Sequence, residues 1–271
     1  MSKVFKPIAL SAGGLDDELA AHGVGMEHVN ELMARMARQL LQDGHRLAFG
    51  GTLGVPDEEL TTLLIDAALG WLGENAAPVC VTEPSSWPLV NYTGWPHYTL
   101  ISPAQKAELV GVCDFVEVLP PDIQADQLAP LCAVEETRAE RLERWRTDLT
   151  TRRYIAEALT HMRQHLTQCA ALRIVWGGRL RGAAGWMAGI AEEVLLSLQL
   201  EQPVLILGGF GGCAKMLADF LETSTAPWPC ELTLENACAD KAYEALIKDS
   251  AHPAQCRQHR CAIGQNDRSR R

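Results

Sequence analysis

The chain repeats one order of elements, in which an apolar strand is followed by a glycine turn and then by a helix. Strands that alternate with helices of about ten or more residues predict a mostly parallel sheet covered on both faces. We therefore expect an α/β fold with three layers, α/β/α, around a central sheet. The predicted strands that run into glycine pairs are residues 5–10, 46–49, 172–176 and 203–207.

The remaining segments fit the same pattern. Apolar residues at helical spacing predict a helix that begins at Pro56 and further helices over residues 26–44, 134–169, 190–198, 214–221 and 235–249. Two more strands are predicted at residues 78–82 and 115–119. Residues 83–106 are rich in Pro, Ser and Trp, show no period and are interpreted as a structured loop. The arginine-rich first half of residues 134–169 is interpreted as a solvated helix face with i,i+4 ion pairs.

Charge and composition exclude several classes of protein. With 24 Lys and Arg residues against 34 Asp and Glu residues, the net charge is −10, which argues against binding to duplex nucleic acid. Hydrophobic residues form 47% of the chain, enough for one large core. We expect a single domain over residues 1–250 and a basic, flexible tail over residues 251–271.

The cysteines and the apolar segments predict the compartment. Nine cysteines at irregular spacing, with no N-terminal signal sequence, favour a reducing compartment, so we expect a cytoplasmic protein. No apolar run is long enough to span a membrane. The His and Cys residues of the tail match no zinc pattern, and we predict no metal site. These tail residues are His252, Cys256, His259 and Cys261.

The glycine turns are the main indication of function. In a parallel sheet the ligand crevice lies beyond the carboxyl ends of the strands, at a topological switch point. Glycine lets backbone N–H groups approach a ligand, and the following helix directs its positive end at an anion. Turns of this kind at four strands favour a nucleotide or another phosphorylated ligand; as an alternative, the glycines only form tight turns. A Walker A motif and a compact GxGxxG are both absent, which argues against ordinary use of NAD by a dehydrogenase.

The turn after residues 172–176 carries the richest chemistry. Arg179 follows Gly177 and Gly178 and could hold a phosphate through two hydrogen bonds. Glu192 and Glu193 open the next helix and could bind a ribose hydroxyl or stabilise an oxocarbenium-like centre. As an alternative, the two acids only complement the helix dipole.

These residues resemble the SLOG superfamily, which unites the SMF/DprA and LOG proteins. LOG phosphoribohydrolases carry a PGGxGTxxE motif after a strand, and the similar order here is Trp176-Gly177-Gly178, Glu192-Glu193 and Gln202-Pro203-Val204. Phe49-Gly50-Gly51 is similar to the family's second-strand turn, and Met162-Arg163 to its Arg-bearing helix. Trp176 replaces the motif proline, the Thr is missing, and the stretch from Gly178 to Glu192 is longer than in LOG proteins.

The resemblance implies a Rossmann-like fold, a homodimer and a site with no required cofactor. The catalytic candidates are Glu193, which we favour over Glu192, and Arg179. Arg152 or Arg153 could replace Arg163, and a second alignment of the motif on residues 208–211 would put Lys215 in the place of the Glu. The ligand-binding candidates are Ser11, Gly13, Gly14, Gly50, Gly51, Thr52, Arg163, Gly177, Gly178, Gly189, Gly208, Gly209, Phe210 and Gly211.

Three functions follow from this resemblance. The first is a sensor that binds a nucleotide or an NAD- or ADP-ribose-like ligand and signals through oligomerisation or a partner; some similar prokaryotic proteins are associated with antiviral defence. The second is a phosphoribohydrolase or N-glycosidase that cleaves a nucleoside 5′-monophosphate, with Glu193 as its carboxylate. The third, DNA handling, conflicts with the net charge of −10.

Overall fold

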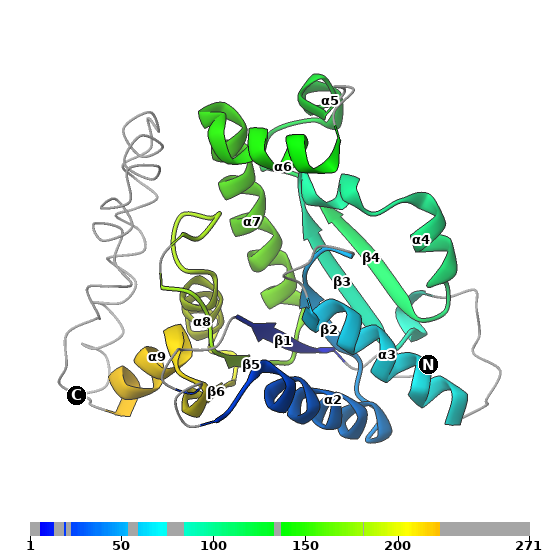
Figure 1. The fold of residues 1–271 in the computed structure, drawn as a ribbon, viewed down its shortest axis with the longest axis vertical. Helices are drawn as coiled ribbons and strands as arrows, with labels where there is room; N and C mark the ends of the chain where they lie inside the picture. The colour runs from blue at the N-terminus through cyan, green and yellow to red at the C-terminus, as the bar shows by residue number, and fades with distance from the viewer. Residues whose placement is uncertain are drawn as a thin grey trace.

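A computed structural model of the chain describes residues 6–13, 19, 23–53, 59–74, 84–132, 137–180 and 182–222. Within these residues, one sheet of six parallel strands runs in the order β4-β3-β2-β1-β5-β6 (Figure 1). The strands are β1 (Ile8–Ala12), β2 (Leu47–Gly50), β3 (Leu89–Gly94), β4 (Cys113–Val118), β5 (Leu172–Trp176) and β6 (Val204–Leu207). The chain leaves β1 toward β2 and later returns to β5 on its other side. The topological switch point therefore lies between β1 and β5.

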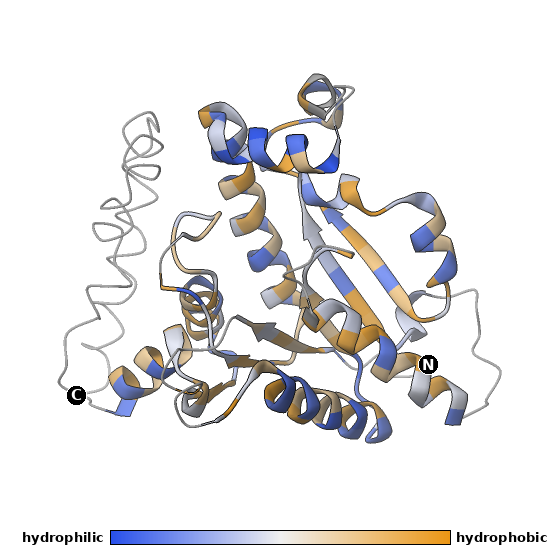
Figure 2. Cartoon of the chain, viewed as in Figure 1, coloured by the Kyte–Doolittle hydropathy of each residue, from blue (hydrophilic) through white to orange (hydrophobic). Residues whose placement is uncertain are grey.

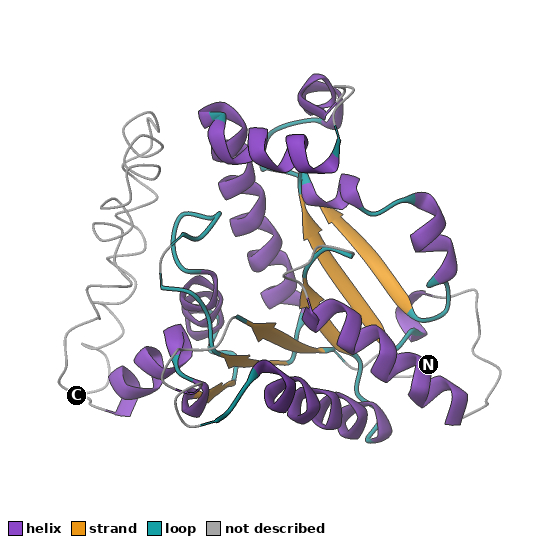
Figure 3. Ribbon diagram, viewed as in Figure 1, coloured by secondary structure: helices purple, strands orange, loops and turns teal. Residues whose placement is uncertain are grey.

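Helices cover both faces of the sheet, which confirms the predicted three-layer, Rossmann-like α/β fold (Figure 3). On one face lie α2 (Met26–Gln42) and α3 (Glu59–Glu74), and on the other lie α7 (Leu149–Cys169) and α8 (Gly189–Gln199). The last described helix, α9 (Gly212–Glu222), packs against α8 and β6. The shorter elements are α4 (Pro103–Glu108), α5 (Ala125–Cys132), α6 (Arg138–Thr147), η1 (Pro84–Ser86), η2 (His97–Leu100) and η3 (Gly208–Phe210).

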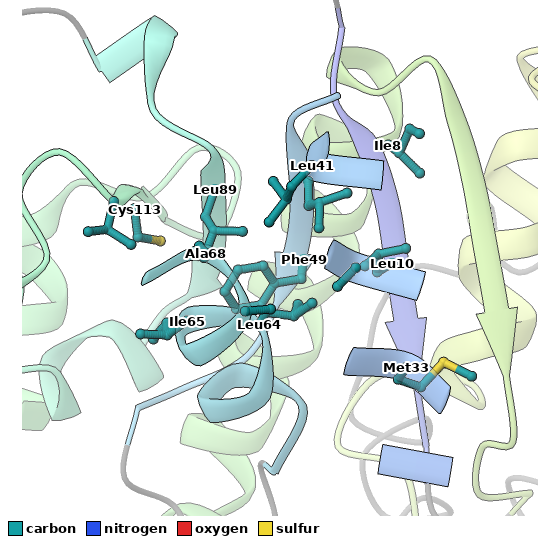
Figure 4. Close-up of a cluster of buried hydrophobic side chains, with 14 of the residues drawn as sticks. Ile8, Leu10, Met33, Leu41, Phe49, Leu64, Ile65, Ala68, Leu89 and Cys113 are labelled. Atoms are coloured by element: carbon teal, nitrogen blue, oxygen red, sulfur yellow. The ribbon is translucent and has the colours of Figure 1, made fainter. Parts of the chain in front are cut away.

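Residues of β1 alternate between the two hydrophobic layers, as the period of a strand requires. Ile8 and Leu10 enter the large cluster under α2 and α3, which Figure 4 shows around Phe49. Ala9 points to the other face, where it packs in the cluster that contains Met162 of α7. Along α2, every fourth residue from Val29 is buried and charged residues separate them, which gives the two-sided pattern in Figure 2.

Small residues let α7 lie close to the sheet. A Cβ added at Gly50 would lie 3.3 Å from the Met162 side chain, and one at Gly94 would lie 3.3 Å from the backbone oxygen of Ala158. Gly50 and Gly94 stand at the carboxyl ends of β2 and β3. A larger side chain at Gly94 would push against the backbone of α7, whereas one at Gly50 would displace the flexible end of the Met162 side chain.

Most predicted elements are confirmed, with two corrections. Residues 83–106 are not a loop throughout, because β3 and η2 lie within them. The predicted helix over residues 134–169 is interrupted at Asp148, whose side chain accepts a hydrogen bond from the backbone N–H of Thr151 at 2.7 Å and caps α7. The predicted strand at 78–82, the helix at 235–249 and the tail at 251–271 lie outside the described residues. No helix among the described residues is long and apolar enough to cross a membrane.

The ring of His97 lies on η2 and meets the ring of Trp145 edge to face, with centroids 5.5 Å apart. Burial lowers the pKa of His97 from 6.5 to about 4. Between these two values the unfolded chain binds a proton that the folded chain does not, so the stability of the fold decreases as the pH falls. The slope from this group is at most about 1.4 kcal/mol per pH unit.

We therefore expect the free energy of unfolding, measured in urea between pH 7 and pH 4, to fall less steeply for His97→Phe than for the wild type. The phenylalanine ring keeps the contact with Trp145 and cannot bind a proton. Equal slopes for the two proteins would show that His97 is not held neutral by the fold.

Candidate functional site

The predicted glycine turns lie together at the carboxyl edge of the sheet. They follow β2, β1, β5 and β6, which are consecutive in the strand order. Gly14 lies outside the described residues. The switch point between β1 and β5 is thus at the centre of this row of turns, where a ligand of an open α/β sheet binds.

Close backbone contacts require glycine in the two central turns. A Cβ on Gly13 would lie 2.2 Å from the Cα of Gly178, so the turns after β1 and β5 touch through their backbones. Gly178 has a φ of +100°, a conformation that side chains rarely adopt. Close packing therefore requires glycine at Gly13 and Gly178, whether or not they also contact a ligand.

The start of α9 is tied to the β5 turn. The backbone N–H of Cys213 donates to the oxygen of Gly178 at 2.9 Å, and that of Ala214 donates to Gly177 at 2.8 Å. These two N–H groups are therefore satisfied within the protein and are not offered to an anion. Burial raises the pKa of the nearby Cys213 thiol to about 12, so this thiol stays protonated and is a poor nucleophile near neutral pH.

Arg163 of α7 and Glu192 of α8 form an ion pair beneath the loop that precedes α8. Nη1 of Arg163 donates to Oε2 of Glu192, and the hydroxyl of Thr160 donates to Oε1 at 2.5 Å. A Cβ on Gly185 or Gly189 would come within 2.8 Å of the Arg163 guanidinium. Both glycines therefore leave room for the arginine, and both oxygens of Glu192 are occupied.

Arg173 of β5 forms the second ion pair. Its Nη1 donates to Oε2 of Glu193 at 2.8 Å and to the hydroxyl of Ser11 at 2.7 Å. Its Nε and Nη2 donate to the hydroxyls of Ser197 and Thr167, at 3.1 and 2.8 Å. Arg173 has no exposed surface; burial lowers its pKa, and the charge of Glu193 opposes that shift.

The two pairs join into one group, which we call the Arg/Glu quartet: Arg163, Arg173, Glu192 and Glu193. Nε of Arg163 lies 3.5 Å from Oε1 of Glu193 and links the pairs. Two positive and two negative charges give the quartet no net charge, which reduces the cost of burying it. The side chain of Glu193 is 13% exposed against 2% for Glu192, so Glu193 is the carboxylate that a ligand can reach. An ionised carboxylate accepts hydrogen bonds and suits a ribose hydroxyl.

Several predicted residues lie outside the quartet. Arg179 is exposed in the loop after β5. Arg153, one of the alternatives to Arg163, pairs with Glu157 at 3.0 Å along α7, and Lys215 is exposed and pairs with Asp219 at 2.9 Å. Thus Arg163, and not Arg153 or Lys215, is the residue that meets the acids of α8.

The other candidates divide between turns and packing. Thr52 is buried just after β2. The side chains of Asn91 and Thr93 donate hydrogen bonds to the backbone oxygen of the preceding Gly51, at 3.0 and 3.1 Å. Phe210 packs against the core under α2 and α3. Gly208 faces Ala218 of α9, and a Cβ there would lie 2.7 Å away. Gly209 and Gly211 lie in and just after η3.

The sequence analysis missed Arg173, which has the most hydrogen-bond partners in the quartet. A charged residue within the apolar segment Leu172–Trp176 is the signal that could have identified it. An ionised side chain inside a strand covered on both faces needs a buried partner. Ser197 and Thr167 carry no such signal, because hydroxyl residues are common on helices.

Among the described residues, no group of three or more His, Cys, Asp or Glu side chains is arranged to hold a metal ion. The histidines and cysteines of the tail lie outside those residues. The family model described as "SLOG cluster2" matches residues 4–263 of the chain. No curated protein matches the sequence significantly.

Proposed function

Since the chain belongs to the SLOG cluster2 family, we propose that it is a sensor for a nucleotide or nucleotide-derived ligand of the NAD or ADP-ribose type. The family match indicates a nucleotide-related function. The proposed site is the switch point between β1 and β5, beside the Arg/Glu quartet. A sensor must pass its signal on, so we expect oligomerisation or a partner protein to depend on the ligand.

The observation that supports this proposal is the position of Glu193. Its carboxylate is held at 2.8 Å by buried Arg173 and is still partly exposed beside the glycine turns. A rigid acceptor of this kind can bind the two hydroxyls of a ribose without moving. The exposed Arg179 and the backbone at the start of α8 would then meet a phosphate.

The occupied carboxylates favour binding over cleavage. Both oxygens of Glu192 accept hydrogen bonds, and Glu193 accepts one from Arg173, so each acid already faces donors of the protein. A general acid must place its own proton on the leaving base, and carboxylate oxygens that already accept hydrogen bonds from the protein are poorly placed to do so.

Cleavage of an N-glycosidic bond is the second candidate, and one observation favours it. An ionised Glu193 beside the sugar could stabilise a positive charge that develops at the anomeric carbon. This role would need no protonated acid if the base leaves as an anion.

Incubation of the full chain with AMP, NAD and ADP-ribose tests both candidates. Binding by calorimetry and a higher melting temperature without released base would support the sensor. Release of free base that Glu193→Gln abolishes would support the hydrolase. If none of the three compounds binds or raises the melting temperature, the proposal fails.

A further inference from the structure

A second group of buried polar atoms lies away from the Arg/Glu quartet. Among the described residues, six buried side-chain polar atoms have no hydrogen-bond partner, and four of them belong to α6, η2 and the first turn of α7. They are Nε of Arg141, Nε1 of Trp145, Nδ1 of His97 and Oγ1 of Thr151. Each such atom costs about 1–3 kcal/mol when it stays unpaired, so a cluster of them points to a ligand.

Helix α6, which carries two of these atoms, lies near the carboxyl end of β3 (Figure 1). Nη2 of Arg138 donates at 3.1 Å to the oxygen of Leu53, just beyond β2, and Trp145 meets His97, just beyond β3. Arg138, Arg141 and Trp145 are spaced by three and four residues and share one face of the helix. Arg141 therefore lies on the side of α6 that carries these two contacts.

Thr151 stands in the first turn of α7, the helix that follows α6 along the chain. It has no exposed surface, and Ile155, one turn further along the helix, packs in one cluster with Trp145 and Trp95. Trp145 is 3% exposed. Two of the four atoms thus belong to buried side chains, and solvent cannot supply the hydrogen bonds that these atoms lack.

The chemistry of the cluster matches an oxyanion. Arg141 has a fixed positive charge, and no ion pair joins it to a carboxylate among the described residues, although the chain carries 34 acids against 24 bases. Trp145 can only donate a hydrogen bond, and Thr151 can donate one as well. His97 is neutral near pH 7, since burial lowers its pKa to about 4. The positive charge that attracts the oxyanion therefore comes from Arg141.

We propose that Arg141, Trp145 and Thr151 form a subsite for a phosphoryl group at the carboxyl ends of β2 and β3. Neighbouring strands are about 4.8 Å apart, so β2 and β3 lie about 5 Å and about 10 Å from β1 along the sheet. The phosphoryl group can therefore be the distal phosphate of a nucleotide whose ribose lies at Glu193, or a separate phosphate ion. The first case rests on the proposed function and the second does not.

The test uses the full chain with inorganic phosphate, AMP and ADP, in three variants. Arg141→Met removes the charge and keeps the length of the side chain. Arg146→Met makes the same change at an exposed position of the same helix and is the matched control. Trp145→Phe removes the indole N–H and identifies its signal in a ¹H–¹⁵N spectrum. Affinities are measured by calorimetry.

We expect the indole signal of Trp145 to shift on titration, and Arg141→Met to weaken binding about tenfold or more while Arg146→Met leaves it unchanged. A distal phosphate predicts that Arg141→Met weakens ADP more than AMP, and a separate ion predicts a loss for inorganic phosphate alone. The proposal is overturned if the Trp145 signal does not move with any probe, or if the two arginine variants bind all three probes equally. Loss of nucleotide binding in Glu193→Gln is a separate result, so the subsite and the proposed function can fail independently.

Discussion

Replacement of Arg173 by methionine is expected to lower the free energy of unfolding by about 3–5 kcal/mol, because it leaves the Glu193 carboxylate with only the longer, 3.5 Å contact to Arg163. Methionine fills a similar volume, so the loss reflects charge and hydrogen bonds more than a cavity. Ser11 also loses its hydrogen bond from Arg173, whereas Ser197 still donates to Gln202 at 2.8 Å and Thr167 to the oxygen of Arg163 at 2.6 Å. Urea unfolding followed by circular dichroism measures the effect.

Arg153→Met is the matched control for this prediction. Arg153 pairs with Glu157 on the partly exposed face of α7, and loss of such a pair costs about 0.5 kcal/mol. The double variant Arg173→Met with Glu193→Met removes both charges and should recover part of the stability lost in the single variant. If Arg173→Met unfolds at the same urea concentration as Arg153→Met, the buried pair does not stabilise the fold as the geometry implies.

The order of strands and helices was predictable because each strand that ends in a glycine turn is a short apolar run. β5, Leu172–Trp176, has the bounds predicted for it. β3, Leu89–Gly94, was missed because all of its residues are buried, so no alternation of polar and apolar residues marks it. Prolines on both sides of it, such as Pro88 and Pro96, are more typical of a loop.

The site was predictable only in part. The glycine turns were recognised from their position after strands, and Arg163 and Glu192 from the order of motif residues. The pairing between α7, α8 and β5 was not predictable, because residues 29 and 20 positions apart meet only in the folded chain. Local spacing therefore identified the two acids at the start of α8. It could not show that Thr160 and Arg163 donate hydrogen bonds to both oxygens of Glu192.

The face of α6 shows the same limit. Its arginines alternate with acids, which favoured a solvated face with i,i+4 pairs. In the structure Arg138 and Arg144 donate to the oxygens of Leu53 and Leu131, and Trp145, which follows Arg144, is buried. A single tryptophan at helical spacing from the arginines was the signal that this side of the helix faces the protein.

Replacement of Glu193 by glutamine is expected to weaken nucleotide binding by about 10- to 100-fold, because a neutral amide is a weaker acceptor for ribose hydroxyls than an ionised carboxylate. If the protein proves to be a hydrolase, the same change should lower kcat by about 100- to 1000-fold, since the negative charge near the anomeric carbon is lost. Calorimetry with the tightest ligand among AMP, NAD and ADP-ribose gives the affinity.

Glu192→Gln is the matched control, because it removes one charge from the same buried quartet. Each variant leaves one arginine with less compensation, so both should destabilise the fold by a similar amount. Only Glu193 has surface to contact a ligand, at 13% exposed against 2% for Glu192, and only its replacement should change the affinity of the folded protein. If Glu192→Gln loses affinity and Glu193→Gln keeps it, the roles are reversed: the ligand must then displace the Thr160 or Arg163 contact to reach Glu192, and binding would involve a rearrangement of α7 against α8.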